Sequence, residues 1–151
     1  MHPVRVQDFQ SVDLEPLVRM WRESFEYGVG VVDPHPIEEQ IAYFEREVRP
    51  KNRVQVAWEG ELIVGFIAAN SESVTQLHVR VGNHRRGIGS KLLNRAKAES
   101  AGSLWLFTFA RNWRACAFYE SQGFRAVQRG FEPMWQLKDV KYAWSRVESA
   151  V

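Results

Sequence analysis

The amino-acid sequence predicts a single mixed α/β domain. Its 151 residues leave room for one domain of ordinary size. Its composition, 45% hydrophobic and 25% charged, is typical of a globular protein that buries a core. The apolar residues follow a helical spacing at first, become strand-like from residue 53, and then alternate between the two patterns. We therefore expect one domain over residues 1–151.

The first part of the chain predicts a short strand followed by two helices. The strand covers Val4–Val6, and the first helix begins after Asp13, whose side chain can accept hydrogen bonds from free N–H groups. Glycines in segment 28–30 end this helix. The second helix begins at Pro36, because the φ angle of proline suits the first helical position, and ends at Pro50. Each helix carries an apolar stripe, which predicts one buried face.

From residue 53 the pattern changes to strands interrupted by two helices. Residues 54–58 and 62–69 are predicted to be strands joined by a tight hairpin at Glu59 and Gly60. The elements that follow are strand, helix, strand, helix, strand and strand, over residues 74–81, 87–100, 104–109, 113–122, 124–127 and 140–144. Residues 130–139 are predicted to form a loop before the last strand.

Composition excludes several classes of protein. The longest apolar run, Leu62–Ala69, is far shorter than the roughly 20 residues that cross a bilayer. The opening residues lack the apolar core of a secretory signal, and a single cysteine, Cys116, cannot form an intramolecular disulfide. A net charge of +2 is too small to indicate a nucleic-acid binder. We expect a cytoplasmic protein with no membrane and no nucleic-acid partner.

Charge is divided unevenly along the chain. Residues 1–50 carry five Arg against ten acidic residues, whereas residues 51–151 carry 15 Lys or Arg against eight acidic residues. This asymmetry favours an anionic ligand on the later part and a cationic ligand near the earlier part. Solvated faces produce similar counts, so that simpler interpretation stays open.

A basic, glycine-containing turn joins a predicted strand to a predicted helix over residues 77–90. A helix N-terminus has N–H groups without helical acceptors and carries partial positive charge. Gly87 and Gly89 let an anion approach these groups, and Arg85 and Arg86 add full charges. The spacing fits neither a Walker loop nor a dinucleotide fingerprint. The turn predicts a phosphate site, with a solvated helix entry as the alternative.

A second block, Asn112–Phe124, follows the next predicted strand. With this block the sequence resembles the GNAT superfamily of acetyl-coenzyme A-dependent N-acetyltransferases. The family's first signature, Gln/Arg-x-x-Gly-x-Gly/Ala, aligns with residues 84–89. Its second, Asn-x-x-Ala-x-x-Phe/Leu-Tyr-x-x-x-Gly-Phe, aligns with the second block. His84 stands where the family usually has Gln or Arg, which predicts a weaker or pH-sensitive contact there.

The resemblance implies a central, mixed but mostly antiparallel sheet of about six or seven strands flanked by about four helices. It implies acetyl-CoA as cosubstrate, no metal, and direct transfer of the acetyl group within a ternary complex. It also implies which residues bind the cofactor, through strand backbone, the basic turn and the second block. These are Leu77, Val79, Val81, His84, Arg85, Arg86, Gly87, Ile88, Gly89, Ser90, Asn112 and Tyr119.

Amine attack on a thioester needs a stabilised oxyanion, a proton for the leaving thiolate and a neutral nitrogen. A backbone N–H near Val79 suits the oxyanion, and the resemblance implies that Tyr119 is the general acid, although a packed helix aromatic is the alternative. His78 is the best base candidate by its ordinary pKa. The family often places a Glu or His on the fourth strand, but the corresponding inward positions here are Ser73 and Thr75. A hydrogen-bonded core residue is the simpler interpretation of a histidine on a central strand. A water relay or an already neutral amine would need no base.

The family resemblance places acceptor specificity in residues 26–35 and 130–139. Acidic side chains there can attract a cationic amine, and an aromatic ring can pack against its alkyl part. Solvated loop acids are the alternative. The candidates for binding the acceptor are Glu26, Asp33, Glu132 and Trp135.

The resemblance leaves the acceptor and the oligomeric state open. A primary amine of a small molecule is the predicted acceptor, with a protein N-terminus or lysine as the alternative. A non-catalytic sensor or interaction module that binds CoA or acetyl-CoA is a rival of another class. Residues 139–144 resemble the last strand of small bacterial members, where this region pairs across a homodimer.

Overall fold

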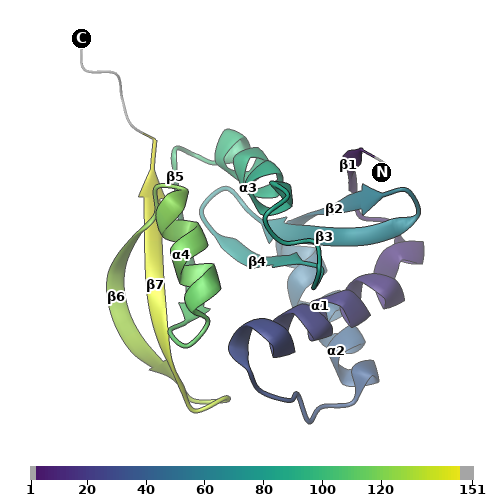
Figure 1. Ribbon diagram of the computed structural model, residues 1–151, viewed down its shortest axis with the longest axis horizontal. Coiled ribbons are helices and arrows are strands. Elements are labelled where there is room, and N and C mark those ends of the chain that lie inside the picture. Colours follow the sequence, from purple (N-terminus) through teal and green to yellow (C-terminus); the bar gives the residue numbers. More distant parts are fainter. Residues whose placement is uncertain (1–2, 147–151) are drawn as a thin grey trace.

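The computed structural model describes residues 3–146 as one mixed α/β domain (Figure 1). The elements are β1 (Val4–Asp8), a 3₁₀ turn (Ser11–Asp13), α1 (Leu14–Val29), α2 (Ile37–Tyr43), a π-helical turn (Phe44–Val48), a second 3₁₀ turn (Arg49–Lys51), β2 (Arg53–Glu59), β3 (Leu62–Ala69), β4 (Val74–Val79), α3 (Ile88–Glu99), β5 (Ser103–Phe109), α4 (Trp113–Ser121), β6 (Arg125–Glu132) and β7 (Leu137–Ser145). Residues 1–2 and 147–151 of the expected domain lie outside the described residues. No helix in the described range is long and apolar enough to span a membrane.

The strands form two sheets rather than one continuous sheet. Their orders are β1-β2-β3-β4 and β5-β7-β6, and every neighbouring pair within them is antiparallel. β4 and β5 are the facing edges, and they meet at a parallel bridge between Ser73 and Trp105. Beyond that bridge β4 and β5 form no ladder, and the two sheets stand apart in Figure 1. The predicted strand number and mostly antiparallel character are confirmed, and the split between the sheets is what creates space for a ligand.

Two apolar cores hold the helices against the sheets. One core joins α1 and the π-helical turn to one face of the first sheet, through residues such as Leu17, Phe44 and Phe66. The other joins α3 and α4 to the opposite face and to the second sheet, through residues such as Leu92 and Tyr142. The second core includes Val74 of β4 and Leu106 of β5, so it packs behind both of the strands that face each other at the split.

The start of α1 differs from the expectation. Asp13 is buried, and its carboxylate accepts the backbone N–H of Gln10 at 2.9 Å rather than a helical amide. It therefore closes the 3₁₀ turn that precedes α1. The predicted stop is confirmed, since Gly30 has a left-handed φ of 77° and its N–H bonds to Glu26 O at 2.9 Å.

The second helix is shorter and less regular than expected. Pro36 precedes α2 as its N-cap residue instead of occupying its first turn. After Tyr43 the backbone widens, so that the N–H of Arg49 bonds to Phe44 O, five residues back. The widened turn buries both Phe44 and Val48 before Pro50 enters the closing 3₁₀ turn.

The β6–β7 hairpin is longer than the expected strands. β6 extends to Glu132 and β7 begins at Leu137, which reduces the expected loop of residues 130–139 to a turn over residues 133–136. β6 is exposed along most of its length, so hydrophobic periodicity gave no signal for its second half. The Glu132 carboxylate closes the turn by accepting the N–H groups of Met134 at 3.0 Å and Trp135 at 2.6 Å.

Candidate functional site

A cleft of about 1410 Å³ opens where β4 and β5 diverge. Its walls come from α1, the α1–α2 loop, β4, the turn before α3, the first residues of α3, β5, α4 and the β6–β7 turn. Most sequence-predicted site residues line this cleft. Val81, Arg86 and Glu26 are the exceptions.

β4 presents one edge of its backbone to the cleft. The N–H of Arg80, just beyond the strand, bonds to Val64 O of β3 at 2.8 Å. Because successive residues of a strand face opposite ways, Leu77 and Val79 direct their backbone groups away from β3. Within residues 3–146, this edge pairs with β5 only at the bridge between Ser73 and Trp105, which lies just before β4 in the chain. The cleft edge of β4 can therefore donate and accept hydrogen bonds from a ligand.

The turn before α3 exposes the helix N-terminus to the cleft. Gly82, Arg85 and Gly87 have positive φ angles of 94°, 65° and 77°. The N–H of Lys91 donates to Gly87 O at 3.0 Å, so the amides of residues 88–90 precede the helical ladder. A Cβ built on Gly87 would meet no atom within 4 Å. This glycine supplies both the left-handed backbone and an open approach to the amides.

Gly89 has a different reason for lacking a side chain. A Cβ there would lie 3.0 Å from Cζ of Phe118 on α4. The glycine therefore permits α3 and α4 to pack closely beside the cleft. Ser90 accepts a hydrogen bond from Gln122 Nε2 at 3.0 Å, which ties the same two segments together.

The two arginines of the turn point to different places. Arg85 lines the cleft. Arg86 forms an ion pair with Glu59 at the end of β2, with 2.5 Å between Nη1 and Oε2. Of the two arginines predicted to face an anion, Arg85 lines the cleft, whereas Arg86 joins the turn to the first sheet.

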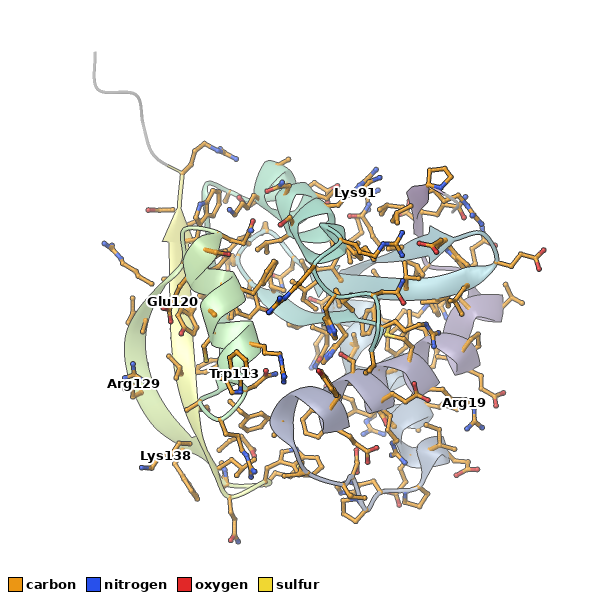
Figure 2. The ribbon with its side chains drawn as sticks, in the orientation of Figure 1. Arg19, Lys91, Trp113, Glu120, Arg129 and Lys138 are labelled. Carbon is orange, nitrogen blue, oxygen red and sulfur yellow. The ribbon has the colours of Figure 1, made fainter. Side chains whose placement is uncertain are left out.

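Three aromatic rings and the guanidinium of Arg114 lie close together in the cleft, beside the turn before α3. The His84 ring stacks on Tyr27 of α1, with 5.8 Å between centroids. Arg114 lies 5.0 Å from the Tyr27 centroid and 4.5 Å from that of Trp113. Figure 2 shows Trp113 at the end of α4 that faces the end of α1. Burial and the charge of Arg114 lower the pKa of His84, which keeps this imidazole neutral at neutral pH.

The sequence prediction missed Arg114 and Tyr27. Arg114 occupies a position that the second signature leaves unspecified, and Tyr27 follows the apolar stripe of α1. Both line the cleft, but their proximity depends on how α1 packs against α4, which periodicity does not reveal.

Asn112 orders the start of α4. Its Oδ1 accepts the N–H of Ala115 at 3.2 Å, which is the bond expected of an N-cap residue. A Cβ built on Gly28 would lie 2.7 Å from Asn112 Nδ2, so the end of α1 passes directly over this cap. These contacts give Asn112 the role of a helix cap, in addition to the cofactor contact that the resemblance implies for it.

Tyr119 is buried between α4 and the second sheet while also lining the cleft. Its ring contacts those of Phe118, Phe124 and Tyr142. Burial, with a smaller electrostatic contribution from Cys116, raises the pKa of Tyr119 above its ordinary range. The phenol consequently stays protonated across the neutral and mildly alkaline range, as a proton donor must.

His78 faces α1 from the wall of the cleft. Its Nε2 lies 3.0 Å from Gln76 Oε1, and its Nδ1 lies 3.3 Å from Ser24 Oγ. Its ring stacks on Phe66, with 5.6 Å between centroids. Burial lowers the pKa of His78 to about 3, so at neutral pH the ring is a weak base with both nitrogens engaged.

The two positions that were expected to face inward, Ser73 just before β4 and Thr75 within it, have different surroundings. Ser73 is buried and hydrogen-bonds to Asn70. Thr75 lines the cleft, but its hydroxyl donates to Ala68 O at 3.1 Å. Neither side chain adds a titrating group.

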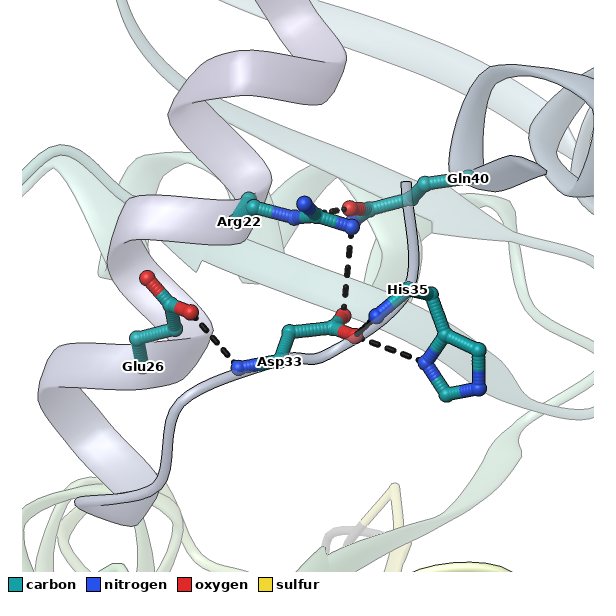
Figure 3. Close-up of polar contacts among 5 residues, drawn as sticks. All are labelled: Arg22, Glu26, Asp33, His35 and Gln40. Carbon is teal, nitrogen blue, oxygen red and sulfur yellow. Dashed lines mark hydrogen bonds and ion pairs between the residues drawn. The ribbon is translucent and has the colours of Figure 1, made fainter. Parts of the chain in front are cut away.

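The acceptor candidates have separate surroundings. Glu26 lies outside the cleft, and its carboxylate accepts the N–H of Asp33 at 2.7 Å (Figure 3). Glu132 lines the cleft, although both of its oxygens serve the β6–β7 turn. Asp33 and Trp135 line the cleft as well, and Trp135 packs against Phe25 with 5.0 Å between centroids.

Comparisons with known proteins agree with this geometry. A family model described as an acetyltransferase (GNAT) domain matches residues 50–126, just over half of the chain. A search of curated proteins found no match.

Many solved structures share the fold. An acetyltransferase from Thermus thermophilus is 23% identical, with a TM-score of 0.77 over 96% of this chain and 99% of that one. An N-acetyltransferase from Thermoplasma acidophilum in complex with coenzyme A is 17% identical, with a TM-score of 0.74 over 95% and 99%. A putative acetyltransferase from Salmonella typhimurium with acetyl-CoA is 15% identical, with a TM-score of 0.69 over 99% and 97%.

The matched region runs from the start of β2 into β6, so it contains the splayed strand, the basic turn and the second signature. Because this match spans more than half of the residues, the chain belongs to the GNAT family of acetyltransferases and is an acyltransferase.

Proposed function

We propose that the chain transfers the acetyl group of acetyl-CoA directly to a primary amine of a small molecule, within a ternary complex. The observation that carries this proposal is the cleft between β4 and β5, which is lined by free strand backbone at one side and by a helix N-terminus at its end. Related folds in complex with coenzyme A and with acetyl-CoA support the choice of cosubstrate.

The lining fits the chemistry of acetyl-CoA. Its pyrophosphate needs amide donors and positive charge, which the open Gly87 turn and Arg85 supply. Its pantetheine arm carries amide groups that can pair with the exposed backbone of Leu77 and Val79 as an added strand would. Arg114 offers a further cation beside the stacked rings of Tyr27 and His84. The molecule supplies an activated acetyl thioester.

The residues near the splay suit direct transfer. The amine nitrogen attacks the thioester carbonyl carbon, and the developing oxyanion takes a hydrogen bond from the Val79 N–H. As the C–S bond breaks, Tyr119 gives its proton to the sulfur. Burial raises the pKa of this phenol, and a buried environment disfavours a free thiolate as well, so both partners of the proton transfer favour their neutral forms.

One observation favours the rival function of a non-catalytic sensor. Both ring nitrogens of His78 are engaged, and its lowered pKa makes it a poor base. A sensor would bind acetyl-CoA without passing the acetyl group to any amine.

A transfer assay separates the two functions. Wild type is incubated with acetyl-CoA and a panel of primary amines, and both thiol release and product mass are measured. We expect acetylated product, and we expect Gly87→Glu to abolish it because the new carboxylate would enter the anion site.

Gly82→Glu is the matched control. Gly82 also has a positive φ and open space around a built Cβ, but it does not line the cleft. The control variant should therefore retain transfer. Absence of product from wild type with every amine would refute the proposed function and favour the sensor.

A further inference from the structure

Asp33 and His35 form a hydrogen-bonded pair on the acceptor side of the cleft (Figure 3). His35 Nδ1 lies 2.7 Å from Asp33 Oδ1, and the backbone N–H of His35 donates to the same oxygen at 2.9 Å. A carboxylate can only accept hydrogen bonds, so Nδ1 carries the hydrogen. The lone pair of the neutral ring is therefore on Nε2, on the side of the ring away from Asp33.

The pair is oriented by α1 and α2. The N–H of Asp33 donates to Glu26, and Asp33 Oδ2 lies 3.6 Å from Arg22 Nη2. Arg22 Nε in turn donates to Gln40 Oε1 at 2.9 Å. The side chain of Asp33 is 10% exposed, whereas that of His35 is 45% exposed. A fixed carboxylate thus holds an imidazole that is open to solvent and to a ligand.

Ring contacts connect His35 to the place where the strands separate. The His35 ring packs edge-on against Trp135, with 5.7 Å between centroids. Trp135 contacts Phe25, which in turn packs against Phe109 of β5 at 6.2 Å. These rings form an apolar wall that runs from the splay to the imidazole.

A proton acceptor of this kind suits transfer to an alkylamine. With a reference pKa of about 10.4, a primary alkylamine arrives mostly as an ammonium ion that has no lone pair for attack. Two charged residues of α1, Arg22 and Glu26, contact Asp33. The acidic residues that line the same cleft are Asp33 itself, Glu39 of α2, Glu132 at the end of β6 and Asp139 of β7. Glu26 and Glu132 are bonded to backbone amides, and arginine is always cationic.

We propose that Nε2 of His35, oriented by Asp33, accepts the proton of the acceptor ammonium, directly or through one water. The inference rests on the proposed function. The imidazolium that forms is stabilised by the carboxylate of Asp33 and later releases its proton to solvent. The freed nitrogen forms the C–N bond as the C–S bond breaks. After the C–N bond has formed, the nitrogen loses a second proton. That proton returns to the Tyr119 oxygen, which has given its own proton to the sulfur.

The same wall selects the chemical class of acceptor. Phe25 and Trp135 offer apolar surface beside the imidazole, so the acceptor is a primary amine on an alkyl or arylalkyl group. Phenethylamine is a probe of this class. Aniline is the contrasting probe, because it is neutral at neutral pH and needs no proton acceptor before attack.

The test is His35→Gln, which keeps a polar side chain of similar reach but does not titrate. Glu38→Gln is the neighbouring control, on the exposed side of α2 and outside the cleft. We expect His35→Gln to lower kcat/KM for phenethylamine roughly 100-fold near neutral pH. The loss should shrink as pH rises to about 9, because more of the amine is then neutral. Aniline acetylation should change by a few-fold at most.

Equal losses with both amines would assign His35 a merely structural role and overturn the inference, as would no loss with either. If wild type acetylates no amine, the proposed function fails first and this step fails with it.

A measurement without turnover checks the geometry. Nitrogen-15 NMR of the intact protein at mildly alkaline pH reports which ring nitrogen of His35 carries the hydrogen. We expect the Nδ1–H form in wild type, with a shift towards Nε2–H in Asp33→Asn. The Nε2–H form in wild type would overturn the inference.

Discussion

Replacing Tyr119 by Phe separates catalysis from folding. Within residues 3–146 the Tyr119 hydroxyl makes no hydrogen bond, whereas its ring packs among buried aromatic residues that Phe preserves. The free energy of unfolding should therefore change by less than about 1 kcal/mol. Loss of a general acid should slow transfer roughly 100-fold, which corresponds to about 2.7 kcal/mol of activation free energy.

Tyr142→Phe is the matched control. The Tyr142 hydroxyl donates to Glu120 Oε2 at 2.6 Å and does not line the cleft. This variant should lose about 1 kcal/mol of stability and keep its turnover. The assay is initial-rate acetylation with acetyl-CoA affinity measured in parallel, since affinity should stay within a few-fold. Unchanged turnover in Tyr119→Phe would refute the general-acid role.

Three further predictions concern stability and binding. Asn112→Ala removes the cap of α4 and should lower the free energy of unfolding by about 1 kcal/mol in chemical denaturation. His78 has an ordinary pKa of 6.5 that is lowered to about 3 in the fold, so the unfolded chain binds its proton first as pH falls. Stability should therefore decline between those pH values, and less steeply in His78→Gln. Arg114→Ala removes a cation beside Tyr27 and should weaken CoA binding more at low than at high ionic strength, measured by calorimetry.

The parts of the site that sequence could predict are encoded in short stretches of backbone. Gly87 was identifiable because a glycine in a basic turn before a helix leaves the first helical amides open to an anion, and a Cβ built there meets no atom within 4 Å. Asn112 was identifiable as the first residue of a helical block, and it caps α4. In both cases the physical signal lies within a few residues.

The parts that could not be predicted depend on residues distant in sequence. The split between β4 and β5 leaves no periodic signature, because the alternation of side chains along a strand does not record whether its backbone edge is paired. Glu132 looked like a loop acid, but a turn consumes both of its oxygens. The sequence gives no signal for His35, because its orientation depends on the hydrogen bond to Asp33 and on the ring contact with Trp135, which is distant in sequence.

The most direct test of the central claim is calorimetric titration of acetyl-CoA into wild type, Gly87→Glu and Gly82→Glu, with each fold checked by circular dichroism. We predict micromolar binding by wild type, loss of binding in Gly87→Glu and retention in Gly82→Glu. Absence of binding by wild type, or equal binding by all three proteins, would contradict the claim that this cleft holds acetyl-CoA at the N-terminus of α3.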